Sequence, residues 1–301
     1  MRSLSVSIAD VDFNNPVMVA SGTFGSGEEY SKYIDLNRLG AVVTKGVADQ
    51  PWMGNPTPRV CETPSGMLNA IGLQNPGIDT FIERDIPFLR RFDTKIIVNV
   101  CGHSKEEYLN VVRKLAWQPV DLLEINISCP NVKAGGITFG TDAGAVEDIT
   151  RAVKDAAGQP VIMKLSPNVT SISEMAKAAE AGGADAISLI NTITGMKIDV
   201  ERQTFLLANK TGGLSGPAIH PVAVRMVYEC ANAVNIPIIG MGGIASAEDA
   251  IEMILAGATA VSVGTMNFYE PRTTMDIVEG IEKYMERHGV RDIKDLIGAV
   301  K

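Results

Sequence analysis

The sequence predicts an α/β fold, namely a (β/α)8 TIM barrel with a short N-terminal β-hairpin and long loops at its C-terminal face. Eight short apolar segments recur along the 301 residues, helical patterns separate most of them, and three connections are unusually long. Most of the apolar segments are continuous rather than alternating, which is typical of parallel strands covered on both faces. The eight predicted strands are Pro16–Ala20, Ala41–Lys45, Lys95–Val100, Leu122–Ile127, Pro160–Leu165, Ala186–Asn191, Pro237–Met241 and Ala260–Val263.

Two short alternating segments precede the first predicted strand. They are Leu4–Ile8 and Val11–Phe13, and the dipeptide Ala9-Asp10 connects them. Alternation of apolar and polar residues around a two-residue turn is typical of a β-hairpin. We expect this hairpin to close the bottom of the barrel.

Helical patterns, with apolar residues recurring on one face, lie between most of the predicted strands. Ser104 and Ser246 have the character of N-caps, because acidic residues follow each of them in the first helical turn. The clearest predicted helices are Lys105–Trp117, Ala143–Ala157, Ser171–Ala181, Pro221–Val234, Ala247–Leu255 and Thr273–His288.

Three connections are much longer than the others, and each of them follows a predicted strand. They are Gly46–Gly77, Ser128–Asp142 and Thr192–His220. All three should therefore project from the C-terminal face of the barrel, and long loops in compact domains tend to be functional. No linker, low-complexity tract or further repeat interrupts the chain, so residues 1–301 are predicted to form a single domain.

The composition excludes several classes of protein. Hydrophobic content of 46% and charged content of 21% are typical of a globular chain, and the net charge of −8 argues against a nucleic-acid partner. The start lacks the apolar region of a signal peptide, and no apolar run approaches a membrane span. The four cysteines form no CxxC, which predicts no metal site and free thiols in a reducing cytoplasm.

Glycine follows the last two predicted strands. Gly242-Gly243 comes after one, Gly264-Thr265 after the other, and Gly216 lies in a further glycine-rich segment. In barrels of this kind, backbone amides after strands seven and eight often bind phosphate. Each glycine motif alone is better explained by a tight turn, whereas the two together favour a phosphate site.

Polar residues end most of the remaining predicted strands. Lys164 is the most unusual of them, because it lies inside an apolar run and a buried lysine is costly unless it is paired. A structural ion pair would account for it. So would an anionic ring or carboxylate, such as a reduced flavin, held between Lys45 and Lys164.

Cys129 lies in a polar loop directly after the predicted strand that carries Asn126. A thiol has an unperturbed pKa of about 8.5, close enough to neutrality for proton abstraction. Position alone leaves a catalytic and an inert thiol equally open. Cys61, Cys101 and Cys230 are predicted to be buried and inert, and His103, His220 and His288 to be surface or structural residues.

Five segments, in order and in spacing over essentially the whole chain, resemble the dihydroorotate dehydrogenase family. They are Ala20–Gly25, Thr44–Gly46, Asn69–Gly77, Asn126–Asn131 and Gly242–Ile244. Cysteine rather than serine at 129 resembles the class 1 enzymes. Asn131–Gly136 and Lys164–Asn168 resemble class 1B, which passes electrons to NAD through a second subunit carrying FAD and a 2Fe–2S cluster.

The resemblance implies oxidation of (S)-dihydroorotate to orotate in de novo pyrimidine (UMP) biosynthesis. A hydride would pass from C6 to FMN, while Cys129 would take a proton from C5. The loop 129–140, with Gly135, Gly136 and Gly140 as hinges, would close over the substrate. The chain would form a homodimer within a heterotetramer.

The resemblance also implies a set of site residues. For FMN they are Ser21, Lys45, Gly46, Asn99, Asn126, Lys164, Ile190, Gly216, Gly242, Gly243, Gly264 and Thr265. For the substrate they are Lys45, Asn69, Ala70, Ile71, Gly72, Leu73, Asn126, Asn191 and Thr192.

Three other hypotheses remain open. The chain could be a class 1A homodimer that reduces fumarate, or a related flavin barrel that reduces another pyrimidine such as uracil. It could also be a non-catalytic barrel that binds a phosphorylated ligand, in which case the purified protein would lack flavin absorbance.

Overall fold

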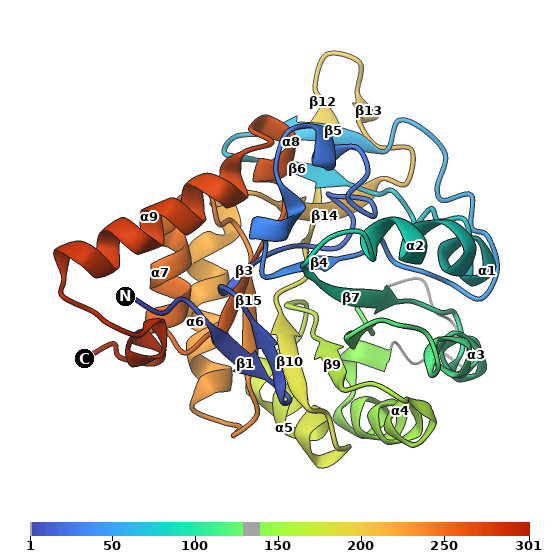
Figure 1. Ribbon diagram of the computed structural model, residues 1–301. Helices are drawn as coiled ribbons and strands as arrows, with labels where there is room; N and C mark the ends of the chain where they lie inside the picture. The colour runs from blue at the N-terminus through green and yellow to red at the C-terminus, as the bar shows by residue number, and fades with distance from the viewer. Residues whose placement is uncertain (1, 129–138) are drawn as a thin grey trace.

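The computed structural model describes residues 2–128 and 139–301, and its centre is a closed barrel of eight parallel strands (Figure 1). Around the barrel the order is β3, β4, β7, β8, β9, β10, β15 and β16, with β16 pairing with β3 to close it. The strands are β3 (Val17–Val19), β4 (Ala41–Val43), β7 (Lys95–Val100), β8 (Leu122–Asn126), β9 (Val161–Lys164), β10 (Ala186–Leu189), β15 (Ile238–Met241) and β16 (Ala260–Val263). The predicted barrel and all eight of its strands are confirmed, with ends that differ by at most two residues.

Helices surround the barrel and bury one face against it. On α3, for example, Tyr108, Val111, Val112 and Leu115 are buried at the spacing of a single helical stripe. The helices are α1 (Ile78–Thr80), α2 (Ile86–Leu89), α3 (Lys105–Leu115), α4 (Ala143–Ala156), α5 (Ile172–Ala181), α6 (His220–Ala231), α7 (Ala247–Leu255), α8 (Met266–Tyr269) and α9 (Thr273–Arg287). A π-helical stretch, Phe81–Asp85, joins α1 to α2.

Both predicted N-caps are confirmed. The Ser104 hydroxyl accepts a hydrogen bond from the Glu107 amide, and Ser246 forms a reciprocal capping box with Asp249. Among the described elements, no α-helix follows β3, where the short 3₁₀ turns η1 (Tyr30–Lys32) and η2 (Leu36–Arg38) replace it. No helix within the described part of the chain is both long and apolar enough to span a bilayer.

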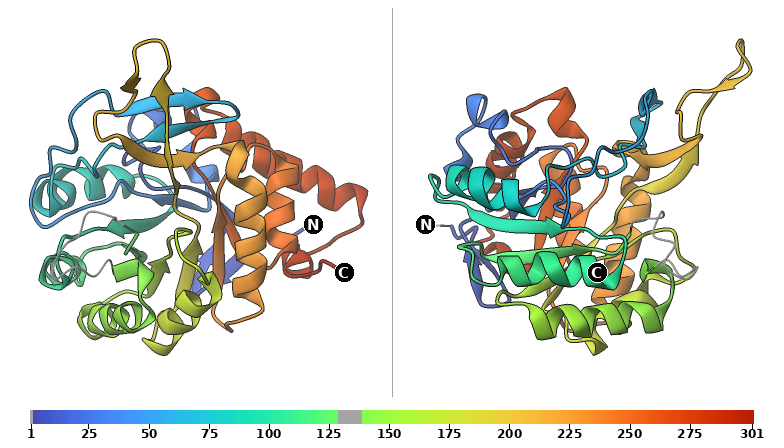
Figure 2. Two further views of the ribbon diagram at one scale, coloured as in Figure 1. Left: turned by 180° about the vertical axis from the view of Figure 1, so that it is seen from behind. Right: turned by 90° about the vertical axis from the view of Figure 1, so that its right-hand side faces the viewer.

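The predicted N-terminal hairpin is confirmed as β1 (Val6–Ile8) paired with β2 (Val11–Phe13). Ala9 and Asp10 form its two-residue turn with φ values of 52° and 61°, as a type I′ turn requires. Val6, Ile8 and Phe13 join the main hydrophobic core. The hairpin lies at the end of the barrel opposite to the long connections (Figure 2).

The long connections after β4 and β10 are not loops alone, and this corrects the sequence-based prediction. Together they form a four-stranded antiparallel sheet in the order β11, β14, β6, β5, and a two-stranded ribbon of β12 and β13. The strands are β5 (Val60–Thr63), β6 (Gly66–Asn69), β11 (Ile193–Met196), β12 (Ile198–Asp199), β13 (Thr204–Phe205) and β14 (Thr211–Ser215). The strand β14 was not predicted, because its glycines give no alternating apolar pattern. Glycine is required at 212, where an added Cβ would lie 2.8 Å from the Asn69 carbonyl oxygen.

Candidate functional site

A cavity of about 580 Å³ lies between the C-terminal ends of the barrel strands and the four-stranded sheet. This volume is within the usual range for small-molecule sites. The structure brings together around it all the residues predicted for cofactor and substrate except Cys129, namely Ser21, Lys45, Gly46, Asn69, Ala70, Ile71, Gly72, Leu73, Asn99, Asn126, Lys164, Ile190, Asn191, Thr192, Gly216, Gly242, Gly243, Gly264 and Thr265. Cys129, the proposed hinges Gly135 and Gly136 and the class 1B segment Asn131–Gly136 lie outside the described residues.

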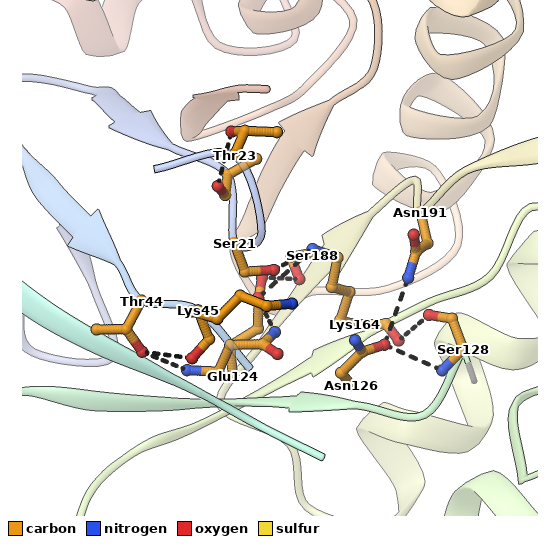
Figure 3. Close-up of polar contacts among 12 residues, drawn as sticks. Ser21, Thr23, Thr44, Lys45, Glu124, Asn126, Ser128, Lys164, Ser188 and Asn191 are labelled. Carbon is orange, nitrogen blue, oxygen red and sulfur yellow. Dashed lines mark hydrogen bonds and ion pairs between the residues drawn. The ribbon is translucent and has the colours of Figure 1, made fainter. Parts of the chain in front are cut away.

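The floor of the cavity contains a buried polar cluster that includes Lys164 (Figure 3). The Lys164 ammonium donates to the Ser21 hydroxyl at 3.1 Å and lies 3.6 Å from the Glu124 carboxylate. The structural ion pair that the sequence left open is therefore present. Lys164 also lines the cavity, so the ion pair does not exclude an anionic ligand there.

Sequence analysis missed Glu124, the one charged residue of β8, which lies among the apolar residues Leu122, Leu123 and Ile125. Its carboxylate accepts hydrogen bonds from the Asn99 amide at 2.6 Å and from the Ser188 hydroxyl at 2.7 Å. The side chain of Glu124 is 1% exposed, and neither it nor Ser188 lines the cavity. The signal was a charged residue inside a buried strand, the same signal that singled out Lys164.

The side-chain amide of Asn99, next to the last residue of β7, forms a hydrogen bond through its NH₂ group but, among the described residues, not through its oxygen. Its NH₂ group donates to Glu124, while its buried Oδ1 has no hydrogen-bond partner among the described residues. A Cβ added at Gly46 would lie 2.9 Å from this oxygen, so glycine at 46 leaves room beside it. A buried acceptor without a partner is costly. The Asn99 carbonyl is therefore suited to accept a hydrogen bond from an N–H of a bound ring.

Lys45 follows β4 and is the second cation of the cavity. It forms no ion pair with any of the described residues. Burial lowers the pKa of Lys45, and the neighbouring positive charge of Lys164 lowers that pKa further, although Cys101 opposes the shift. A bound anion would stabilise the charged form of Lys45. The charge of Lys164, at the floor of the cavity, is thus compensated by Glu124, whereas no carboxylate among the described residues compensates Lys45.

Amides surround the part of the cavity above the C-terminal ends of β8 and β10. Asn191 donates to the Asn126 carbonyl at 3.4 Å, and the Asn126 carbonyl also accepts from the Ser128 backbone amide at 3.3 Å (Figure 3). The Asn191 carbonyl accepts from the Thr192 backbone amide at 2.7 Å. These contacts hold the two asparagines in fixed orientations, and each amide can both donate and accept.

The glycine-rich turns after β15 and β16 line another part of the cavity. Gly242 and Gly243 have φ values of 130° and 71°, which side-chain-bearing residues rarely adopt. A Cβ at Gly243 would lie 2.8 Å from the Gly216 carbonyl oxygen, so this glycine is required by backbone packing. Gly264 differs, because a Cβ there would meet only Ala20, at 3.6 Å.

His220, predicted as a surface or structural residue, is buried behind these turns. One ring nitrogen of His220 lies 2.9 Å from the Gly242 carbonyl oxygen, and the other lies 3.1 Å from the Glu252 carboxylate. His220 does not line the cavity, which fits a structural role. His103 and His288 each pack against an aromatic ring, of Trp52 and Tyr284 respectively.

The predicted burial of the other cysteines is confirmed at two of three positions. Cys101 and Cys230 are buried, and burial raises the pKa of the Cys230 thiol to about 12. The prediction was wrong for Cys61, which is partly exposed because β5 is an edge strand of the added sheet. Among the described residues, the side chains that could jointly hold a metal are His220, Asp249 and Glu252, and no cysteine is among them.

The chain is similar to known proteins over nearly its whole length. A family model described as dihydroorotate dehydrogenase matches residues 3–285. A relative from Lachnoclostridium phytofermentans, named "Dihydroorotate dehydrogenase B (NAD(+)), catalytic subunit", is 65% identical over 99% of each chain. Relatives with the same name from Alkaliphilus metalliredigens and Geotalea uraniireducens are 62% and 56% identical, over 99% of this chain and 99% and 98% of theirs.

We predict that Gly264→Val abolishes FMN binding without unfolding the protein. The added side chain has room at its Cβ but projects where the phosphate is expected, whereas the same change at Gly243 would strain the backbone. Loss of two or more charge-assisted hydrogen bonds should weaken FMN at least about a hundredfold. Fluorescence titration of the apo protein with FMN measures this.

Gly144→Val is the matched control, because Gly144 is exposed on α4 and away from the cavity. It should bind FMN like the unmodified protein. If Gly264→Val also binds FMN normally and melts normally, then the phosphate does not lie at Gly264.

Proposed function

The chain belongs to the dihydroorotate dehydrogenase family, and on that premise we propose that it is the FMN-binding catalytic subunit of an NAD-linked enzyme that oxidises (S)-dihydroorotate to orotate in pyrimidine biosynthesis. The observation that carries the proposal is one cavity with an anchored donor and a free acceptor at its floor, an unpaired lysine, and fixed amides around them. Two of the most similar relatives, 65% and 62% identical, carry the same name.

The residues around the cavity fit FMN. Backbone amides of the turns at Gly216, Gly242–Gly243 and Gly264–Thr265 would hold the phosphate, in the place where such barrels commonly bind one. Asn99 and Lys164 would meet the polar edge of the ring, with one acceptor and one charged donor. When bound, FMN supplies a hydride acceptor, and the protein's part is to hold and orient both ring and substrate.

Dihydroorotate presents ring amides and a carboxylate, and the cavity offers complementary groups. Asn69, Asn126 and Asn191 would donate to and accept from the ring amides. Lys45 would bind the carboxylate, since burial disfavours its charge and no aspartate or glutamate among the described residues forms an ion pair with it. Because the substrate would bury this charge together with its own, both ions would be compensated only in the complex.

We propose Cys129 as the base that takes the C5 proton. Among the described residues that line the cavity, none is a histidine, carboxylate, tyrosine or cysteine, so the ordinary candidates for a neutral-pH base are missing from the walls. Cys129 follows Ser128, which lines the cavity beside Asn126. The thiolate would accept the proton while the amides hold the substrate ring in place.

We propose that the electrons leave through a separate subunit that carries FAD and a 2Fe–2S cluster, in a heterotetramer built on a homodimer of this chain. The support is the name that the relatives carry, "catalytic subunit" of an NAD(+)-linked enzyme. The free thiols of Cys61 and Cys230 support a cytoplasmic location.

The test of the function is anaerobic mixing of the FMN-loaded chain with dihydroorotate. The flavin absorbance should bleach within one turnover, and the rate should rise as pH approaches the thiol pKa of about 8.5. Cys129→Ala should retain FMN and bleach roughly two to four orders of magnitude more slowly, the usual contribution of a positioned base. Bleaching of Cys129→Ala at the unmodified rate would place the base elsewhere.

We also predict that orotate binding weakens as pH rises. Burial lowers the pKa of Lys45, so Lys45 loses its charge at a lower pH than an ordinary lysine, and the affinity for an anion is lost as pH rises through that value. Lys45→Met should weaken orotate about 10- to 100-fold at neutral pH and remove this pH dependence. Titration of the flavin spectrum with orotate between neutral and alkaline pH measures both effects.

The matched control is Lys210→Met, which removes a lysine in the connection between β13 and β14 whose ammonium lies 5.6 Å from the Phe205 ring. Its orotate affinity should equal that of the unmodified protein at every pH. A pH dependence that survives in Lys45→Met would assign the titration to another group.

A further inference from the structure

We propose that Glu124 is a positioning residue that orients Asn99 and Lys164 toward the flavin and lowers its reduction potential. The inference rests on the FMN site of the proposed function and concerns a residue that does not touch the cavity. Three side chains converge on its carboxylate. Asn99 comes from β7 and Lys164 from β9, the strands on either side of β8, and Ser188 comes from β10, two strands away.

The first step is the orientation of the Asn99 amide. An ionised carboxylate can only accept hydrogen bonds, so Glu124 forces the NH₂ group of Asn99 toward itself. The 2.6 Å contact between the two groups leaves the Asn99 carbonyl as the half of the amide that is free. Without Glu124 the amide could turn over, and it would then present a donor in place of an acceptor.

The second step is the position of the Lys164 ammonium. Of its three N–H donors, one reaches Ser21 at 3.1 Å and one points toward Glu124 at 3.6 Å. One donor is left for a group in the cavity. Lys164 is thus held by two contacts within the protein before any ligand binds, and both side chains of the ion pair are at most 5% exposed.

The third step is the charge beneath the cavity. The negative charge of Glu124 partly cancels the positive charge of Lys164 at points farther away than the 3.6 Å that separates them. Reduction of a flavin adds negative charge to its ring, which an uncompensated lysine would favour strongly. Glu124 opposes this effect, so it holds the reduction potential below the value that Lys164 alone would give.

The alternative is that Glu124 only stabilises the barrel. Buried ion pairs are weak contributors to stability, and apolar residues of similar size often replace them without loss. The interior of such barrels is ordinarily filled by branched apolar side chains. A carboxylate with a purely structural role would therefore be less favourable at this position than an apolar side chain. The orientation of two cavity-lining side chains accounts for its presence.

The test compares Glu124→Gln with the unmodified protein, both loaded with FMN and reduced without dihydroorotate. The variant keeps the size of the side chain and removes its charge. We expect the affinity for reduced FMN relative to oxidised FMN to rise about tenfold, which is a positive shift of about 30 mV for a two-electron couple. Oxidised FMN should bind severalfold more weakly, because glutamine can donate as well as accept and no longer forces Asn99 to direct its NH₂ group inward.

Ser188→Ala is the matched control, since it removes one hydrogen bond to the same carboxylate and leaves the charge in place. It should lower the melting temperature without changing the potential. An unchanged potential in Glu124→Gln, or an equal shift in Ser188→Ala, would overturn the inference. If Glu124→Gln does not fold, the potential of Glu124→Met, which removes the same charge, decides in its place.

This design separates the inference from the proposed function. If the unmodified chain binds no FMN, the proposed function is wrong. If the unmodified chain binds FMN and Glu124→Gln has the same potential, only the role of Glu124 is wrong.

Discussion

The carboxylate of Glu124 lies inside the barrel, bonded to Asn99 and Ser188 and paired with Lys164, and the arrangement of the site depends on it. Burying these polar and charged groups costs free energy, and a barrel with a purely apolar interior would not have this cost. The cost is tolerable because every charge is compensated by a neighbour on an adjacent strand. The outcome is a polar floor to the cavity, fixed by the strand register rather than by mobile loops.

The two lysines of the cavity differ in whether a negative charge within the protein compensates their positive charge. Lys164 has an internal counter-ion, so its position is set whether or not a ligand is present. Lys45 has none among the described residues, and burial lowers its pKa. Lys164 is therefore suited to hold a permanently bound cofactor, and Lys45 is suited to bind an anion that dissociates after each turnover. This division explains how a chain with net charge −8 can bind anionic ligands.

Local sequence was sufficient for the barrel but not for contacts between strands. The eight strands were predictable because each is a continuous apolar run, and both N-caps because Ser104 and Ser246 precede acidic residues. The strand β14 was missed because its glycines fit closely against β6 and carry no apolar alternation. Lys164 was recognised as unusual, and Glu124 carries the same local signal, a charge inside an apolar strand. That the two side chains pair depends on the register of β8 and β9, which no local pattern reveals.

The most direct test of the account is the double variant Glu124→Leu with Lys164→Met, in which melting temperature and FMN affinity are measured on the same apo protein. If the buried pair serves the ligand, the variant should keep its fold, with only a modest fall in melting temperature from the unpartnered Asn99 and Ser188 groups, and should have lost FMN binding. A much lower melting temperature combined with undiminished FMN affinity would show that the pair holds the barrel together, and would contradict the account.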